Sequence, residues 1–149
     1  MQPGNCGCLW FTEAAANNIA TVPEGSPNNF AEIGVPTAAS EPLGITQTLD
    51  GTIWFTEFSA GKIGRYDVNT STFTEYALGS GHSPAFITEG RDGNAWFTDV
   101  AGNAVGTITG SGAVTEYAIP TANAEPWRID PSLYFTELLG NKIGFVRYR

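Results

Sequence analysis

Residues that could carry out acid–base or metal chemistry are few in this sequence, and one set of them recurs at regular intervals. His82 is the only histidine, and an imidazole can act as a general base near neutral pH. Cys6 and Cys8 could form half of a metal or redox site. Carboxylates that could surround a divalent cation end each copy of a short aromatic phrase; they are Glu13, Glu57, Asp99 and Glu137.

Each of these groups could also have a plain structural role. His82 lies in a glycine- and serine-bearing loop, two residues before Pro84, where we expect a solvated histidine. The repeated acids would satisfy hydrogen bonds at the loops of their own repeats, because a repeat-wide role explains a repeat-wide residue. Cys6 and Cys8 would close a strained ring, and structural zinc normally needs four ligands, so we expect two incidental thiols.

The acids belong to an internal repeat. The phrase Trp-Phe-Thr-Glu or a close variant begins at Trp10, Trp54, Trp96 and Tyr134, with spacings of 44, 42 and 38 residues. Three further phrases keep step with it, and all four are short, aromatic and β-branched, which predicts strands. They are the segments led by Pro42, Pro84 and Pro126, the segments around Ile19, Ile63, Val105 and Ile143, and residues 31–33, 74–76 and 115–117.

The adjacent Trp and Phe of the phrase indicate the architecture. Neighbouring residues of a strand point to opposite faces of its sheet, so two large apolar residues in a row require burial on both faces. Four strands in a repeat of about 42 residues are typical of a β-propeller blade. A two-sheet sandwich would show alternating apolar and polar residues instead. Asp50-Gly51 and Asp92-Gly93 predict tight hairpins before the Trp-Phe phrase.

The sequence therefore predicts an all-β fold, a partial β-propeller of about three and a half four-stranded blades. We expect one incomplete domain over residues 1–149, with blades near 1–35, 43–78, 85–119 and 127–149. The two end blades would each expose an apolar face of about 500–1,000 Å². Either further blades of a longer protein or a second copy bound head to tail could cover these faces, and we favour the longer protein.

Charge and hydropathy exclude some partners. The net charge of −8 disfavours binding to nucleic acids and to anionic membranes. No apolar run approaches the roughly 18 residues that a membrane span needs. The segment from Met1 shows no basic region followed by an apolar core, so no signal peptide is visible in it, and the compartment stays open.

The phrases together resemble the streptogramin lyases, the virginiamycin B lyase family. Those that carry the resemblance are Trp-Phe-Thr-Glu, Glu41 to Thr46, Thr115 to Pro120 and Asn141 to Gly144. The resemblance implies a seven-bladed propeller in which the proline phrase is the innermost strand and the Trp-Phe phrase the second. It also implies ring opening of a cyclic depsipeptide by elimination at its ester bond, assisted by Mg²⁺ and a histidine base, and hence antibiotic resistance.

The residues that this activity requires are not matched here. The family's histidines directly follow the inner-strand proline, where this chain has Leu43, Ala85 and Trp127. Of the family's metal ligands, the glutamate before that proline is matched by Glu41 and Glu125 alone, which makes them the candidate Mg²⁺ ligands. The second carboxylate, four residues after the leading aromatic, is replaced by Ala14, Phe58, Val100 and Leu138.

Two functions follow as alternatives. The chain could be part of a lyase-like propeller whose catalytic residues lie in other blades. It could also be a non-catalytic propeller that binds a small molecule or a protein at its channel mouth. His82 stays a candidate base, one position from the family's glutamate.

The acids of the fourth phrase are expected to face solvent, with basic residues of the third phrase as their partners. The acids are Glu32, Glu75 and Glu116, and the basic residues are Lys62, Arg65 and Lys142.

Overall fold

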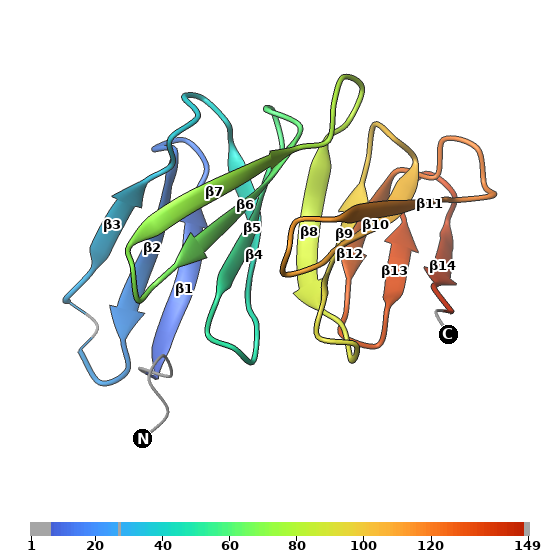
Figure 1. Ribbon diagram of the computed structural model, residues 1–149. Coiled ribbons are helices and arrows are strands. Elements are labelled where there is room, and N and C mark those ends of the chain that lie inside the picture. The colour runs from blue at the N-terminus through green and yellow to red at the C-terminus, as the bar shows by residue number, and fades with distance from the viewer. Residues whose placement is uncertain (1–6, 27, 148–149) are drawn as a thin grey trace.

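The computed structural model describes residues 7–26 and 28–147. In them the chain forms fourteen β-strands and no helix, and the strands make four antiparallel sheets, each with its strands in chain order (Figure 1). Accordingly, these residues contain no helix that could cross a membrane. The predicted all-β class is confirmed.

The four sheets follow one another along the chain. The first contains β1 (Cys8–Glu13), β2 (Asn18–Pro23) and β3 (Ala31–Gly34). The second contains β4 (Pro42–Gln47), β5 (Ile53–Glu57), β6 (Lys62–Asp67) and β7 (Thr72–Ala77). The third contains β8 (Pro84–Glu89), β9 (Ala95–Asp99), β10 (Ala104–Ile108) and β11 (Val114–Ala118). The fourth contains β12 (Pro126–Ile129), β13 (Tyr134–Glu137) and β14 (Lys142–Phe145).

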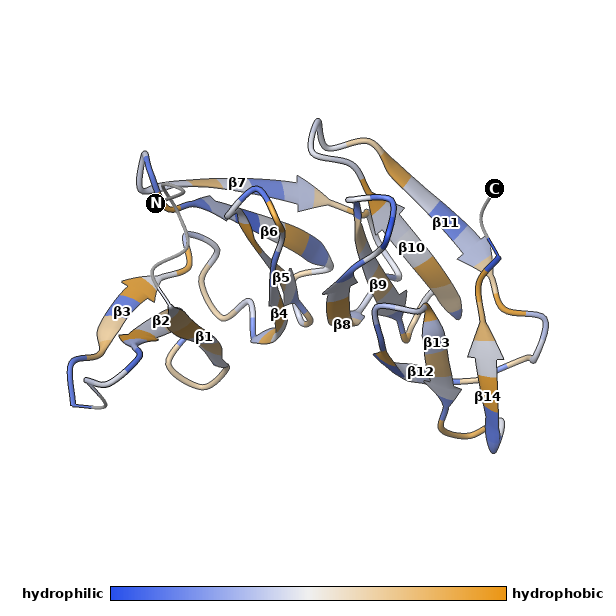
Figure 2. Cartoon of the chain, turned by 90° about the horizontal axis from the view of Figure 1, so that it is seen from below, coloured by the Kyte–Doolittle hydropathy of each residue, from blue (hydrophilic) through white to orange (hydrophobic). Residues whose placement is uncertain are grey.

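The sheets are arranged like the spokes of a partial wheel. Figure 2 shows β1, β4, β8 and β12 toward a common centre and β3, β7, β11 and β14 away from it. The inner strands contact one another in order, β1 with β4, β4 with β8 and β8 with β12. This radial arrangement of antiparallel sheets is that of a β-propeller, and the chain forms an arc of one.

The Trp-Phe pair packs on both faces of its sheet. Trp54, 3% exposed, lies in a core with Ile87 and Phe97 of the third sheet. Phe55, fully buried, lies in another core with Ile19 and other residues next to the first sheet. Burial of both faces, which the sequence predicted from this pair, is therefore what holds neighbouring sheets together.

The glycine of the third-strand phrase leaves room for the phenylalanine ring. Phe55 pairs with Gly64 across β5 and β6. A Cβ atom at Gly64 would lie 2.1 Å from the Phe55 Cζ atom, far inside van der Waals contact. The third and fourth sheets repeat this arrangement with Phe97 over Gly106 and Phe135 over Gly144.

The threonine of the phrase links each sheet to the next. The Thr56 hydroxyl accepts a hydrogen bond from the Gly44 N–H of its own sheet at 2.8 Å and donates one to the Ala85 carbonyl of the third sheet at 2.7 Å. Thr98 likewise donates to the Trp127 carbonyl at 2.6 Å, and Thr12 to the Leu43 carbonyl at 2.8 Å. A small buried hydroxyl that must both accept and donate explains why threonine recurs at this position.

The shorter fourth repeat keeps the strand register of its siblings. Pro126 pairs with Glu137 as Pro42 pairs with Glu57, and both inner strands have an irregularity after the proline. The shortening lies after Ile129, where the pairing of β12 with β13 ends and a hairpin follows in which Leu133 adopts a φ of 62°. In the second and third sheets the predicted hairpin glycines Gly51 and Gly93 have φ values of 88° and 76°.

The outer faces of the two end sheets are exposed. On the fourth sheet Tyr134, Ile143 and Phe145 are 52%, 73% and 49% exposed, whereas Trp54 and Ile63, the counterparts of the first two in the second sheet, are 3% and 0% exposed. On the first sheet Leu9 and Phe30 are 65% and 58% exposed. Each end of the arc thus presents the kind of apolar face that is buried between inner sheets.

Cys8, the first residue of β1, is disulfide-bonded. Cys6 lies outside the described residues. The expectation of incidental thiols is therefore wrong for Cys8.

Candidate functional site

The two positions at which the family resemblance places metal carboxylates are neighbours in space. The Phe58 N–H donates to the Glu41 carbonyl at 3.1 Å, and the Leu138 N–H donates to the Glu125 carbonyl at 3.1 Å. In the third sheet the Val100 N–H makes the same bond to Ser83. Side chains at these paired positions could share a cation if both were carboxylates.

The residues present at these positions do not fit Mg²⁺. The second member of each pair is apolar, since it is Phe58, Val100 or Leu138. The Glu41 carboxylate is exposed and accepts a hydrogen bond from the Ser59 hydroxyl at 2.5 Å. Mg²⁺ demands an octahedral set of oxygen ligands, and neither Glu41 nor Glu125 has a second carboxylate at the paired position.

The expected histidine positions on the inner strands carry the apolar side chains of Leu43, Ala85 and Trp127, and Trp127 belongs to an aromatic group with Phe58 and Phe86. The Trp127 ring lies 6.1 Å from the Phe58 ring and 5.8 Å from the Phe86 ring, both edge to face. The Arg128 guanidinium lies 4.2 Å from the centre of the Phe86 ring. None of the side chains at the expected histidine positions, Leu43, Ala85 and Trp127, can act as a base.

The four repeated acids do not form one ring in the part of the chain that the structure describes. Glu13 accepts a hydrogen bond from Asn18 at 3.2 Å. Asp99, fully buried, satisfies loops of its own sheet, as expected, by accepting from the Ser83 and Gly102 N–H groups. Glu57 and Glu137 are also buried, and both oxygens of Glu57 and one oxygen of Glu137 have no hydrogen-bond partner.

The buried Glu57 belongs to a charged cluster of the second sheet. Burial raises the pKa of Glu57 to about 7, and the nearby Glu75 carboxylate raises it as well. The Lys62 ammonium lies 3.2 Å from the Glu75 carboxylate, as expected, and donates to the Thr37 hydroxyl at 2.7 Å. The expectation that Glu75 faces solvent is wrong, because its side chain is only 18% exposed and also accepts from Thr37.

The other two basic residues do not meet outer acids. The Lys142 ammonium donates to the Thr121 hydroxyl at 3.2 Å, and the Arg65 guanidinium lies over the Trp54 ring at 5.8 Å. Their expected pairing with outer-strand acids is therefore replaced by a hydroxyl and by an aromatic ring.

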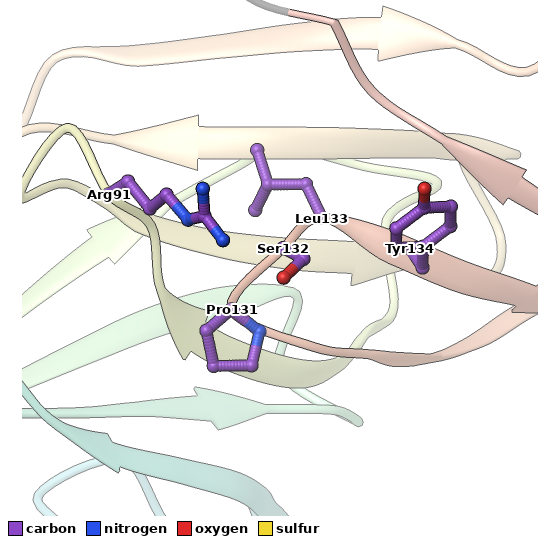
Figure 3. A pocket seen from close by; sticks show the side chains of 5 residues that line it. All are labelled: Arg91, Pro131, Ser132, Leu133 and Tyr134. Atoms are coloured by element: carbon purple, nitrogen blue, oxygen red, sulfur yellow. The ribbon is translucent and has the colours of Figure 1, made fainter.

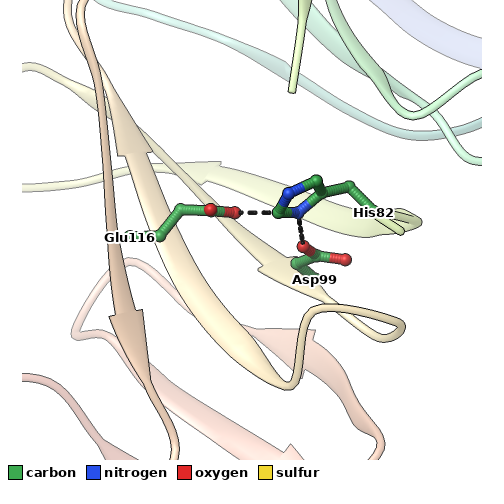
Figure 4. Close-up of side chains that lie close together, drawn as sticks. All are labelled: His82, Asp99 and Glu116. Atoms are coloured by element: carbon green, nitrogen blue, oxygen red, sulfur yellow. Dashed lines mark hydrogen bonds and ion pairs between the residues drawn. The ribbon is translucent and has the colours of Figure 1, made fainter. Parts of the chain in front are cut away.

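The corresponding cluster of the third sheet contains the only histidine. Figure 4 shows the His82 ring between Asp99 and Glu116. His82 Nδ1 lies 2.5 Å from Asp99 Oδ2 and 3.4 Å from Glu116 Oε1. The hydrogen bond to Asp99 raises the pKa of His82. The expectation of a solvated loop histidine is wrong, because the His82 side chain is 22% exposed and paired with two acids.

His82 takes the place of a lysine. The residue opposite the buried acid is Lys62 in the second sheet and Lys142 in the fourth, but Ala104 in the third. The third sheet, which has no lysine opposite its buried acid, is also the sheet whose buried acid contacts the histidine. This exchange can be seen in the aligned repeats, but only the strand pairing shows that the two positions meet.

A cavity in the described part of the chain lies apart from the cluster of His82, Asp99 and Glu116. It measures about 350 Å³ and is lined by Arg91, Pro131, Ser132, Leu133 and Tyr134 (Figure 3). His82 precedes β8 and Arg91 follows it, so the cavity is at the other end of this strand. None of the candidate site residues lines it.

A radial arc of antiparallel sheets, built from an aromatic repeat of about 42 residues, defines the chain as part of a β-propeller. The chain belongs to the virginiamycin B lyase family, whose model matches residues 1–149. It is 34% identical over 140 residues to a virginiamycin B lyase of Nocardia farcinica (strain IFM 10152), a match that covers 92% of this chain and 47% of that protein.

Solved structures agree with this assignment. A streptogramin B lyase structure matches with a TM-score of 0.89 and 41% identity, covering 95% of this chain and 48% of the other. Virginiamycin B lyase from Staphylococcus aureus matches with a TM-score of 0.88 and 41% identity, covering 96% and 50%, and a catalytically inactive form of it has been crystallised with quinupristin. The chain spans about half the length of these relatives.

Proposed function

We propose that the whole protein to which these blades belong opens the ring of a cyclic depsipeptide of the streptogramin B class. The ester bond breaks by elimination, so no water is added to the product. Membership of the family supports this proposal, as do the high TM-scores to a streptogramin B lyase and to a relative crystallised with quinupristin.

In this proposal residues 7–147 form the non-catalytic part of the ring. The observation that carries this division is the set of inner-strand positions, where the three described prolines are followed by Leu43, Ala85 and Trp127. A histidine base and the ligands of Mg²⁺ would come from other blades, which would also cover the two exposed faces of the arc.

The test compares the 149-residue chain with the protein encoded by the uninterrupted reading frame around it. Each is incubated with a streptogramin B, with Mg²⁺ or with a chelator, and the products are separated and weighed by mass spectrometry. The longer protein should give a linear product of unchanged mass in the presence of Mg²⁺, and the 149-residue chain should give none. A longer protein that leaves the substrate cyclic, or a product heavier by one water, would contradict the proposal.

A second candidate function is binding without turnover, and the aromatic group favours it. Phe58, Phe86 and Trp127 come from three sheets and are each partly exposed; Phe58 follows β5, and the other two lie on the inner strands β8 and β12. Aromatic side chains of this kind bind apolar rings. Tight binding of a streptogramin B by the longer protein with no linear product would favour this function over the lyase.

A further inference from the structure

The cluster of His82, Asp99 and Glu116 brings together ligand atoms from three elements. His82 comes from the linker before β8, Asp99 from the end of β9 and Glu116 from the middle of β11. One nitrogen or oxygen atom from each residue lies within 4.8 Å of the other two. Among the described residues no other group of three such side chains is so close.

The surrounding backbone orients the Asp99 carboxylate. Its Oδ1 atom accepts from the Ser83 N–H at 2.8 Å and from the Gly102 N–H at 3.1 Å, which leaves Oδ2 directed at His82. A Cβ atom at Gly102 would lie 2.1 Å from Oδ2 and 3.1 Å from His82 Nδ1. The space beside both ligand atoms therefore stays open because residue 102 has no side chain, and hydrogen bonds of this kind fix a ligand before a metal binds.

The cluster has two carboxylates and no permanent positive charge. In the second sheet the equivalent acids Glu57 and Glu75 are accompanied by the Lys62 ammonium. In the third sheet Ala104 stands at the lysine position, so only His82 can offset the charges of Asp99 and Glu116. Two close carboxylates in a partly buried place are costly without a cation. The comparison of the two sheets thus shows, independently of the ligand geometry, that this cluster lacks the lysine of its neighbour, so its positive charge must come from protonated His82 or from a bound ion.

We propose that His82 Nδ1, Asp99 Oδ2 and a Glu116 oxygen bind a divalent transition-metal ion of the zinc class. One imidazole nitrogen and two carboxylate oxygens suit Zn²⁺, which accepts mixed nitrogen and oxygen ligands at about 2.0–2.2 Å. The side chains of His82 and Glu116 are 22% and 28% exposed, so an ion can enter from solvent and keep a water as a further ligand. The site is separate from the Glu41 and Glu125 positions and does not depend on the proposed lyase activity.

Binding exchanges a proton for the metal. In protonated His82 the Nδ1 proton, which lies between Nδ1 and Asp99 Oδ2, leaves to solvent while Nε2 keeps its own proton. The neutral imidazole then binds the ion through the Nδ1 lone pair, and Asp99 binds it through Oδ2. Tetrahedral ligation places ligand atoms about 3.3 Å apart. The separation of His82 and Glu116 is already 3.4 Å, and that of His82 and Asp99 grows from 2.5 Å by rotation of the loop histidine.

Calorimetric titration of the 149-residue chain with Zn²⁺ and the absorption spectrum with Co²⁺ test the proposal. We expect one ion per chain, visible absorption bands of Co²⁺ bound by nitrogen and oxygen, and affinity that falls by about tenfold per pH unit below the pKa of His82. His82→Ala and Glu116→Gln should each weaken binding by about 10–100-fold. Glu75→Gln, a matched change in the lysine-containing cluster, should leave binding unchanged.

Circular dichroism checks that each variant folds. If His82→Ala does not fold, Glu116→Gln, which lies on an exposed strand, still tests the metal site. Equal Zn²⁺ affinity in the parent chain and the Glu116→Gln variant would overturn the proposal. So would the absence of Zn²⁺ binding to the parent chain at millimolar concentration. In that case protonated His82 alone would replace the lysine.

Discussion

Glu57 and Asp99 occupy the same position in neighbouring sheets, and each buries a carboxylate in a different way. Asp99 receives two backbone N–H groups and the His82 ring. Glu57 receives none, and burial raises its pKa to about 7. A carboxyl group that is buried without donors is stable in its neutral form, so its ionisation opposes folding.

The pH dependence of stability tests this description of Glu57. Between pH 4.5 and 7 the folded chain holds a proton on Glu57 that the unfolded chain has lost, so this residue lowers stability as the pH rises through that range, by up to about 3 kcal/mol. The Glu57→Gln variant should therefore unfold at higher urea concentration than the parent at pH 8 and at nearly the same concentration at pH 4. Equal midpoints of parent and variant at pH 8 would show that Glu57 is not a buried acid.

The sequence identified the residues capable of acid–base or metal chemistry, but not the residues that they contact in the folded chain. The recurrence of Glu13, Glu57, Asp99 and Glu137 was visible, and so was the absence of histidines after the inner-strand prolines. The His82 contacts were not, because they join a linker, the end of one strand and the middle of another. Such contacts depend on strand register, and in this fold the register is set by the packing of the whole sheet.

At the scale of the strand, a few positions of the phrase determine how one sheet meets the next. Trp54 packs against the third sheet, and Phe55 packs toward the first sheet over Gly64. The Thr56 hydroxyl forms one hydrogen bond within its own sheet and one with the third sheet. Strand positions and hairpins were predictable from the repeat because each strand has its own residue signature. The threonine bridge was not, since nothing in a single repeat shows which carbonyl the hydroxyl reaches.

The threonine bridge gives a prediction with a matched control. Thr56→Val removes a buried hydroxyl that makes two hydrogen bonds, so the Gly44 N–H and the Ala85 carbonyl lose a partner. The free energy of unfolding should fall by about 1–3 kcal/mol. Thr136→Val changes the same position on the exposed end sheet, where the hydroxyl bonds only to Arg128, and should cost under about 1 kcal/mol. Equal losses in urea denaturation would contradict the bridging role.

At the scale of the whole molecule, the arc has two faces that resemble its own internal interfaces. Tyr134 and Ile143 on one end face correspond to Trp54 and Ile63, which the next sheet buries completely or nearly so. The sequence predicted both faces, because the same apolar pattern runs through the end repeats. Covering 500–1,000 Å² of such surface stabilises by about 10–25 kcal/mol before entropy is subtracted.

The association state and exposed apolar surface of the isolated chain test the central claim that it is a section of a wheel. We would measure its mass by light scattering together with the fluorescence of a hydrophobic dye, and compare the Ile143→Glu variant. The chain should either associate beyond its 15.8 kDa monomer or bind the dye strongly. Whichever of the two the parent chain shows, association or dye binding, should be weaker in the Ile143→Glu variant. A folded monomer that binds no dye would contradict the account, because both end faces would then be covered by the chain itself.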